Sequence, residues 1–301
     1  MKTKIMICGI VLALTWSLAA TLKAQDIYVA NGGGTTIGEY GLDGSVINAS
    51  LISGLYDLNA PWGVAISGND LFVANAGSGT VGEYTTSGAT VNTSLISGLS
   101  GPTSIAISGN NLLVANYGTD TVGEYTTSGA TVNASLISGL KFPIGIAISG
   151  NNLFVVNEGY SNGNGTVGEY TTSGATVSAS LISGLNAPWG IAISGNDLFV
   201  VNQNNGTISE YTTSGAIVNA SLISGLTLPW GIAISGNDLF VANYGADTVG
   251  EYTTSGATVN ASLVSGLDAP TGMAISPVPE PSASMLAGFG AAALWLWRRR
   301  M

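Results

Sequence analysis

The sequence predicts an all-β protein, a six-bladed β-propeller of four-stranded antiparallel blades. Three observations lead to this prediction: one unit recurs six times, each unit holds four short β-forming runs, and the two ends of the repeat array are offset by one run. Four strands in about 40 residues is the proportion of one propeller blade. The prolines that lead the units lie 41, 41, 45, 41 and 41 residues apart, at Pro61, Pro102, Pro143, Pro188, Pro229 and Pro270.

The four runs of each unit are rich in Ile, Val, Tyr, Phe and Thr. In the unit that begins at Pro188 they are Gly190–Ser194, Leu198–Asn202, Thr207–Thr212 and Ile217–Ile223. Turn-forming segments of the type Ser-Gly-Asn-Asp and Thr-Thr-Ser-Gly separate them, as expected for short antiparallel strands. No stretch of this body has a helical period with caps, so we expect strands alone between residues 25 and 276.

The offset between the two ends predicts a closed ring. The body begins at Asp26–Asn31, which matches the second strand of the unit, and stops at Pro270–Ser276, which matches the first strand. The C-terminal segment can therefore supply the missing inner strand of the first blade. Such sharing leaves no open sheet edge between the first and last blades.

Composition and charge exclude several kinds of chemistry. The chain has 301 residues, of which 8% are charged, with 17 acidic and 7 basic side chains; between residues 25 and 277 the only base is Lys141. A body this acidic should repel nucleic acid and anionic lipid. The chain has no histidine and a single cysteine, Cys8, which excludes histidine triads, Cys/His zinc sites and disulfides. No cofactor is expected; carboxylates suit Ca²⁺, but no EF-hand-like spacing supports it.

The N-terminal segment, residues 1–24, has the layout of a secretory signal peptide. Lys2 and Lys4 precede an apolar run that would form the signal helix, and the small residue Ala24 ends the segment. We expect cleavage after Ala24, with cleavage after Ala20 as the alternative.

The C-terminal segment, residues 277–301, has three parts. They are a proline-rich motif, a short apolar stretch that predicts a transmembrane helix, and a basic cluster that should stay in the cytoplasm. The motif and the cluster consist of Val278, Pro279, Glu280 and Pro281, and of Arg298, Arg299 and Arg300. In this order the parts resemble the PEP-CTERM sorting signal of Gram-negative bacteria. The resemblance implies processing by an exosortase, transient membrane anchoring through the tail alone, and delivery to the cell surface or extracellular matrix. A plain tail anchor is the alternative.

The repeat unit resembles the NHL repeat. Pro188–Ile193 follows its pattern of proline, glycine, alanine and apolar residues, and Leu198–Asn202 follows its second strand, with Asn202 where that family usually has Asp. The resemblance spans residues 26–276 and implies a β-propeller.

The loops predict a variable face and a constant face. Because antiparallel strands alternate in direction, the loops from second to third strand and from outer to next inner strand share one end of the ring. These loops differ between units, whereas the turns at the other end barely change. Binding residues are often carried by loops, although drift in unconstrained loops is the alternative.

The variable face gathers the candidate ligand-binding residues Trp62, Trp189, Trp230, Tyr117, Tyr244, Asp120 and Asp247. Aromatic rings can stack on a pyranose while carboxylates take its hydroxyls. The alternative is that the tryptophans plug the central channel. Two further six-fold sets have a local interpretation: we expect the asparagines that end the second strands to form Asx turns, and the glutamates on the third strands to face solvent.

Together these features favour a non-catalytic exported protein that binds an exopolysaccharide, another glycan or a surface protein. The alternatives are a metal-dependent hydrolase like the lactonases, which share the propeller fold, and a purely structural surface spacer. Propellers of similar sequence also include antibiotic-ring lyases that need histidine, and the absence of histidine excludes that mechanism.

Overall fold

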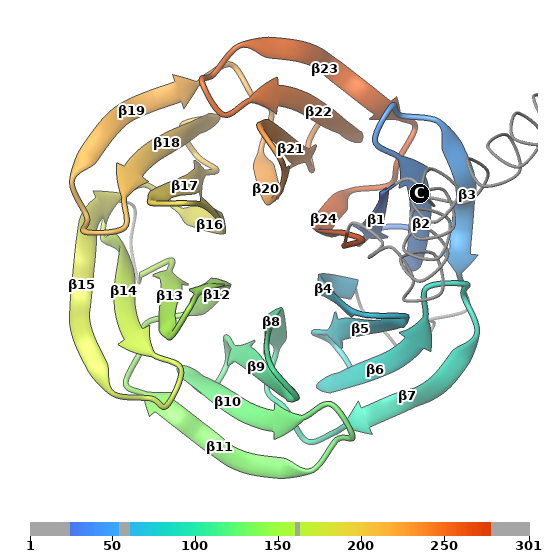
Figure 1. Ribbon diagram of the computed structural model, residues 1–301, viewed down its shortest axis with the longest axis vertical. Coiled ribbons are helices and arrows are strands. Elements are labelled where there is room, and N and C mark those ends of the chain that lie inside the picture. The colour runs from blue at the N-terminus through green and yellow to red at the C-terminus, as the bar shows by residue number, and fades with distance from the viewer. Residues whose placement is uncertain (1–24, 54–60, 160–162, 278–301) are drawn as a thin grey trace, which may run out of the picture. The chain divides into compact units, whose positions relative to one another are not determined.

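The computed structural model describes residues 25–53, 61–159 and 163–277, and these form six four-stranded antiparallel sheets arranged around a central axis (Figure 1). The predicted six-bladed propeller is confirmed. The predicted signal helix, the C-terminal transmembrane helix and the sorting residues Val278–Pro281 and Arg298–Arg300 lie outside the described residues. Within the described part of the chain, no helix is long and apolar enough to cross a membrane.

Each blade runs from an inner strand to an outer strand. In that order the strands are β24 (Pro270–Ile275), β1 (Asp26–Asn31), β2 (Thr36–Gly41) and β3 (Val46–Ile52); β4 (Pro61–Ser67), β5 (Asp70–Asn75), β6 (Thr80–Thr85) and β7 (Thr90–Ile96); β8 (Pro102–Ser108), β9 (Asn111–Asn116), β10 (Thr121–Thr126) and β11 (Thr131–Ser138); β12 (Pro143–Ser149), β13 (Asn152–Asn157), β14 (Gly165–Thr171) and β15 (Thr176–Leu185); β16 (Pro188–Ser194), β17 (Asp197–Asn202), β18 (Thr207–Thr212) and β19 (Ile217–Ile223); β20 (Pro229–Ser235), β21 (Asp238–Asn243), β22 (Thr248–Thr253) and β23 (Thr258–Ser265).

The first blade is shared between the two ends of the described chain, as the offset predicts. Strand β24 pairs antiparallel with β1, with Ile275 opposite Ile27 and Met273 opposite Val29 (Figure 1). Beside this ladder, the Ser276 amide donates to the carbonyl of Asp26 at 2.9 Å. The Thr271 hydroxyl reaches the carbonyl of Pro61 in the next blade at 2.7 Å. Ring closure therefore completes the first blade and also bonds it to the second blade.

The hydrophobic core lies between the blades. The second strand of each blade is buried on both faces, which explains why Leu71–Ala74 and the equivalent segments are continuous apolar runs. One cluster joins Ala30 and Ile37 of the first blade to Val64 and Tyr84 of the second. The tyrosines of the third strands are thus blade-to-blade packing residues, and each blade is stabilised by its neighbours.

Two sets of polar residues are more buried than the sequence suggested. The asparagines that end the second strands are 0–5% exposed, and Asn31 and Asn202 donate across to Thr36 at 3.2 Å and to Ser209 at 2.8 Å. Glu39 is buried and accepts a hydrogen bond from Tyr28 at 2.9 Å. Lateral packing of one blade on the next covers these positions, which local patterns alone cannot indicate.

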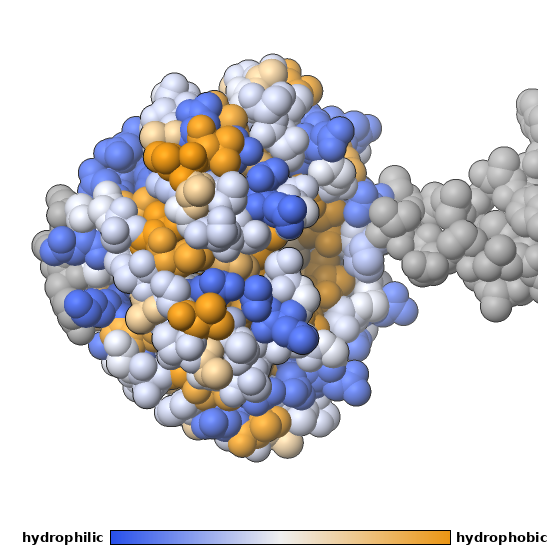
Figure 2. Space-filling model, turned by 60° about the vertical axis from the view of Figure 1, so that its left-hand side comes forward, coloured by the Kyte–Doolittle hydropathy of each residue, from blue (hydrophilic) through white to orange (hydrophobic). Residues whose placement is uncertain are grey.

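The outer strands are exposed over most of their length. In β7 the first five residues are exposed, and only the end of the strand is covered. Figure 2 shows one flank of the ring, where separate hydrophobic patches lie among polar residues. The end of an outer strand is covered by the Thr-Thr-Ser-Gly turn of the next blade. The glycine of that turn packs on the carbonyl of a leucine in the outer strand.

This turn glycine predicts a position-specific stability effect. Gly256 has φ +87°, and a Cβ there would lie 2.6 Å from the carbonyl oxygen of Leu222 in the preceding blade. We expect Gly256→Ala to lower the free energy of unfolding by at least about 2 kcal/mol, because backbone strain and a backbone clash combine. Urea unfolding followed by circular dichroism measures this.

The matched control is Gly109→Ala. Gly109 also has a positive φ, +57°, but no atom lies within 4 Å of its Cβ position. Only the left-handed conformation then matters, at about 1 kcal/mol. Equal losses in the two variants would show that the turn does not hold the blades together.

Candidate ligand-binding face

The loops that form the variable face are tied together in pairs. Each loop between second and third strands bonds to a loop that leads from an outer strand to the next inner strand. The amide of Tyr117 donates to Gly101 at 3.0 Å, that of Glu158 to Phe142 at 3.1 Å, and that of Tyr244 to Leu228. Both sets of loops therefore lie on one end of the ring and form one surface.

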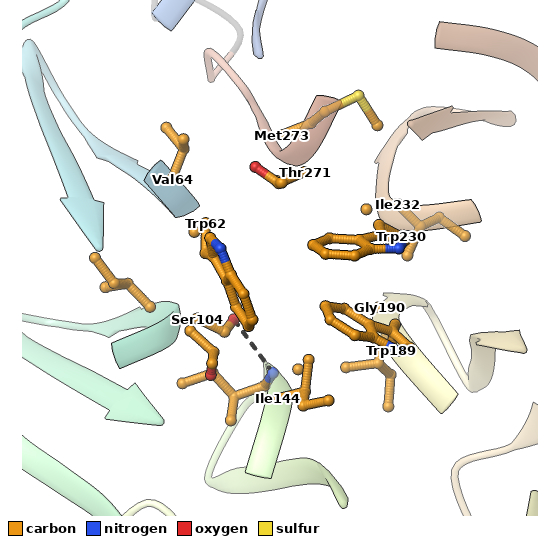
Figure 3. Close-up of a pocket in the computed structure, with 18 residues that line it drawn as sticks. Trp62, Val64, Ser104, Ile144, Trp189, Gly190, Trp230, Ile232, Thr271 and Met273 are labelled. Atoms are coloured by element: carbon orange, nitrogen blue, oxygen red, sulfur yellow. Dashed lines mark hydrogen bonds between the residues drawn. The ribbon is translucent and has the colours of Figure 1, made fainter. Parts of the chain in front are cut away.

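Four aromatic residues meet at the axis on this face. Trp189 and Trp230 stack with ring centroids 3.8 Å apart, and Trp62 packs against both at 5.5 Å (Figure 3). Tyr244 stacks on Trp230 at 4.2 Å with an interplanar angle of 10°. We call Trp62, Trp189, Trp230 and Tyr244 the tryptophan cluster. All four are half-buried, so their rings contact one another and also reach the surface.

The tryptophan cluster borders a small recess lined by all six inner strands. Thr103, Ile144 and Thr271 take the place of tryptophan in the other three blades. The recess has a volume of about 140 Å³, whereas pockets for small organic ligands usually measure about 300–1,000 Å³. The rings thus fill most of the channel end. A ligand of this face would rest on the rings rather than enter the channel.

In two of these tryptophans the indole nitrogen is buried inside the protein. The Nε1 atoms of Trp189 and Trp230 are buried and have no hydrogen-bond partner within the described residues. On the wall of the recess, the Ser104 hydroxyl accepts a hydrogen bond from the Ile146 amide of the next blade at 3.4 Å (Figure 3). Trp189 and Trp230 therefore offer ring surface for stacking but no accessible indole donor.

Asp120 and Asp247 each join two neighbouring loops of the variable face. Both have positive φ, 57° and 56°. Their carboxylates accept hydrogen bonds from the amides of Phe142 at 2.8 Å and Ala269 at 2.9 Å. These contacts give each aspartate a local role in shaping the face, and their contact with a ligand stays a prediction.

A second aromatic group lies apart from the tryptophan cluster, around Tyr117. Its ring stacks on Phe142 at 4.7 Å, and its hydroxyl donates to Glu158 at 3.4 Å. The exposed Lys141, the one base of the ring, directly precedes Phe142. Sequence reasoning missed Phe142 and Glu158 as parts of this face. The signal available was the four-residue lengthening of that repeat, in which Glu158 begins the longer loop.

Acidic residues line the opposite, constant face. Between the fifth and sixth blades a groove of about 570 Å³ contains Asp197 and Glu210. Burial, and then repulsion from Asp197, raises the pKa of the Glu210 carboxyl. No group of three or more His, Cys, Asp or Glu side chains within the described residues could hold a metal ion.

The comparisons with known proteins agree with this architecture. The family model of the virginiamycin B lyase family matches residues 64–280, which is 217 of the 301 residues. The chain belongs to the virginiamycin B lyase family. A second model, the PEP-CTERM protein-sorting motif, matches residues 277–300. That match confirms the resemblance of the tail and indicates export with membrane-anchored sorting through the C-terminus in a bacterium, with processing by an exosortase.

Solved structures share the fold at low sequence identity. A chain in the crystal structure of a nidogen/laminin complex matches with a TM-score of 0.72 and 14% identity, over 85% of this chain and 100% of that one. A gluconolactonase from Xanthomonas campestris has 0.60 and 15%, over 70% and 78%. Virginiamycin B lyase from Staphylococcus aureus has 0.55 and 20%, over 70% and 73%. No curated protein matches the sequence significantly.

This member of the virginiamycin B lyase family has no histidine anywhere in its sequence. Without histidine, a general base on the variable face would have to be a carboxylate, a tyrosine or Lys141. Burial raises the pKa of the Glu158 carboxyl, and the hydrogen bond from Tyr117 opposes that shift. The Glu158 carboxyl is already bonded to the Tyr117 hydroxyl, which argues for a structural role.

The perturbed pKa of Glu158 predicts a pH-dependent stability. Because the folded pKa is raised, stability falls as pH rises from about 4 through the folded pKa. We expect Glu158→Gln to raise the melting temperature at pH 7 and to leave it unchanged at about pH 3. Scanning calorimetry at both pH values measures this.

Asp43 is the control of opposite sign. Hydrogen bonds from the side chain and amide of Ser45 lower the pKa of the exposed Asp43 carboxyl. Asp43→Asn should therefore lower the melting temperature at pH 7, and this loss should shrink as the pH falls from about 4 through the folded pKa. If both variants shift in one direction at pH 7, net charge rather than local environment controls stability.

Proposed function

We propose that this protein is a non-catalytic binding protein of the cell surface or extracellular matrix of a Gram-negative bacterium, and that its variable face binds a glycan such as an exopolysaccharide. The tryptophan cluster carries the proposal. It places partly exposed rings at the centre of the face, beside loops rich in amides and hydroxyls. Stacking on the apolar side of a pyranose needs such rings, and the shallow recess suits a ligand that lies across the face.

The proposed route to the surface follows from the two ends of the chain. Residues 1–24 would be removed after Ala24 on export, residues 25–276 would form the mature ring, and residues 277–301 would act as the sorting signal for an exosortase. The last strand of the ring, β24, ends at Ile275. Processing within the tail would therefore leave the ring closed.

Two alternatives have specific support. The nidogen/laminin likeness shows that a chain with this fold occurs in a protein complex, so a surface protein is a second candidate partner. Because a gluconolactonase has a similar fold, a metal-dependent hydrolase is the other alternative. Lactone hydrolysis by the purified ring after addition of Ca²⁺, Mg²⁺, Mn²⁺ or Zn²⁺ would favour the hydrolase over the binding protein.

Intrinsic fluorescence gives a direct test of glycan binding. Of the six tryptophans in the chain, only Trp62, Trp189 and Trp230 lie between residues 25 and 277, and all three are in the tryptophan cluster. A glycan array would first select an oligosaccharide, from neutral and uronic-acid-containing sets. Titration of residues 25–277 with that oligosaccharide should then change the tryptophan emission.

The paired variant Trp189→Ala, Trp230→Ala should weaken binding by about fivefold or more, because two stacked rings contribute about 1–3 kcal/mol. Isothermal titration calorimetry measures this loss. The control is Asn237→Ala, an exposed residue of the constant face, which should bind like the parent. Absence of binding to every glycan would overturn the proposal, and unchanged binding by the paired variant would move the site away from the tryptophan cluster.

A further inference from the structure

We propose that the outer rim of the ring is a homotypic contact surface, through which copies of this protein pack side by side. The rim is defined as the exposed first halves of the outer strands β3, β7, β11, β15, β19 and β23. This inference goes beyond the proposed function, because it concerns neither the variable face nor a glycan. It rests on apolar exposure, on the distribution of charge and on the six-fold repetition of the same surface.

Every outer strand exposes a β-branched apolar residue at the same repeat position. These residues are 51–56% exposed: Ile47, Val91, Val132, Val177, Val218 and Val259. Val46 and Ile217, which are 65% and 61% exposed, enlarge the set in two blades. Hydrophobic patches appear on the flank shown in Figure 2. Scattered exposed valines need no explanation, but a ring of them at one structural position marks a contact surface.

The rim is also the uncharged part of an acidic molecule. Of the 17 acidic residues only Glu280 lies beyond residue 277 and none lies before residue 25, so sixteen belong to the body, against the single base Lys141. None of the six outer strands contains a charged residue or a proline. The nearest carboxylates lie one strand inward, such as Glu210, which pairs with Asn219. Rim-to-rim contact therefore places no charge in the interface itself, and the repulsion that remains comes from groups behind it. Charged residues and proline are the usual means of keeping sheet edges from associating.

The contact would use side chains rather than added strands. In five of the outer strands an asparagine side chain accepts a hydrogen bond from the serine amide two residues later, as between Asn133 and Ser135 at 3.1 Å. The register of the outer strand also shifts at this point. The bulge and the bonded amide interrupt the row of backbone groups that a further strand would need. The expected association is therefore reversible and not fibrillar.

A second copy fits the rim better than a different partner does. All six outer strands are nearly alike, so any one can meet its equivalent on another copy across a two-fold axis, as self-complementary interfaces require. Each contact is small, and the six around the ring allow several neighbours at once. On a surface where many copies are anchored, repeated weak contacts give a layer through avidity.

Analytical ultracentrifugation of residues 25–277, which contain all the described strands, tests the inference without any glycan. We expect the weight-average mass to rise with protein concentration, and to rise further in 0.5 M NaCl at about a 4 Å screening length, because salt weakens repulsion between the acidic bodies. Replacing the six β-branched residues by threonine, which keeps strand propensity, should abolish the increase. Circular dichroism and thermal unfolding check that this variant folds.

Site-specific cross-linking gives a second test that needs only a single substitution. The body has no cysteine, so Val132→Cys introduces a unique thiol on the rim. Its oxidation should give disulfide-linked dimers at least about tenfold faster than Asn110→Cys, whose thiol lies in an exposed turn of the constant face.

Three results would overturn the inference. They are a constant monomer mass at all concentrations and salt levels, equal association by the threonine variant, and equal cross-linking rates for the two cysteines. If the protein stays monomeric but its rim binds polysaccharide or lipid vesicles, the partner of the rim is not a second copy and the inference is overturned. Because no glycan is present in either experiment, failure here leaves the proposed function of the variable face untouched.

Discussion

The pairing of β24 with β1 is the constraint on which the rest of the molecule depends. The blades have no independent cores, since each hydrophobic cluster joins residues of two neighbouring blades. A blade without a neighbour would expose one whole side of its sheet, so stability requires the last blade to meet the first. The backbone ladder between β24 and β1 closes the ring inside the sheet of the first blade. The hydrogen bond from the Thr271 hydroxyl to the Pro61 carbonyl joins this blade to the second one.

Closure also determines where function can lie. The inner strands converge on the axis, and large side chains at their second positions must share a narrow space. Trp62, Trp189 and Trp230 come from three separate blades and stack there, with Tyr244 joining from a loop. The tryptophan cluster leaves little channel volume but presents ring surface to the exterior. The central recess is thus a product of the packing of the ring and not a preformed cavity for a buried substrate.

Membership of the virginiamycin B lyase family accounts for the fold of this ring and does not by itself establish its chemistry. Fold likeness extends to a lyase, a gluconolactonase and a chain in a nidogen/laminin complex, and function resides in the site grafted on such a fold. Here the grafted features are aromatic stacks, loop-bound aspartates and an acidic constant face. They combine with a sorting motif that sends the protein to the cell surface.

The sequence alone determined the blade count, the strand order and the shared first blade, because the repeat period, the β-forming runs and the offset of Asp26–Asn31 against Pro270–Ser276 are all readable along the chain. It also identified the sorting motif and the aromatic residues of the variable face. Only the tertiary structure decided that three tryptophans far apart in sequence stack on one another, that Tyr117 pairs with Phe142, and that the strand-end asparagines are buried. Those outcomes depend on the curvature of the ring and on lateral contact between blades, which no local pattern encodes.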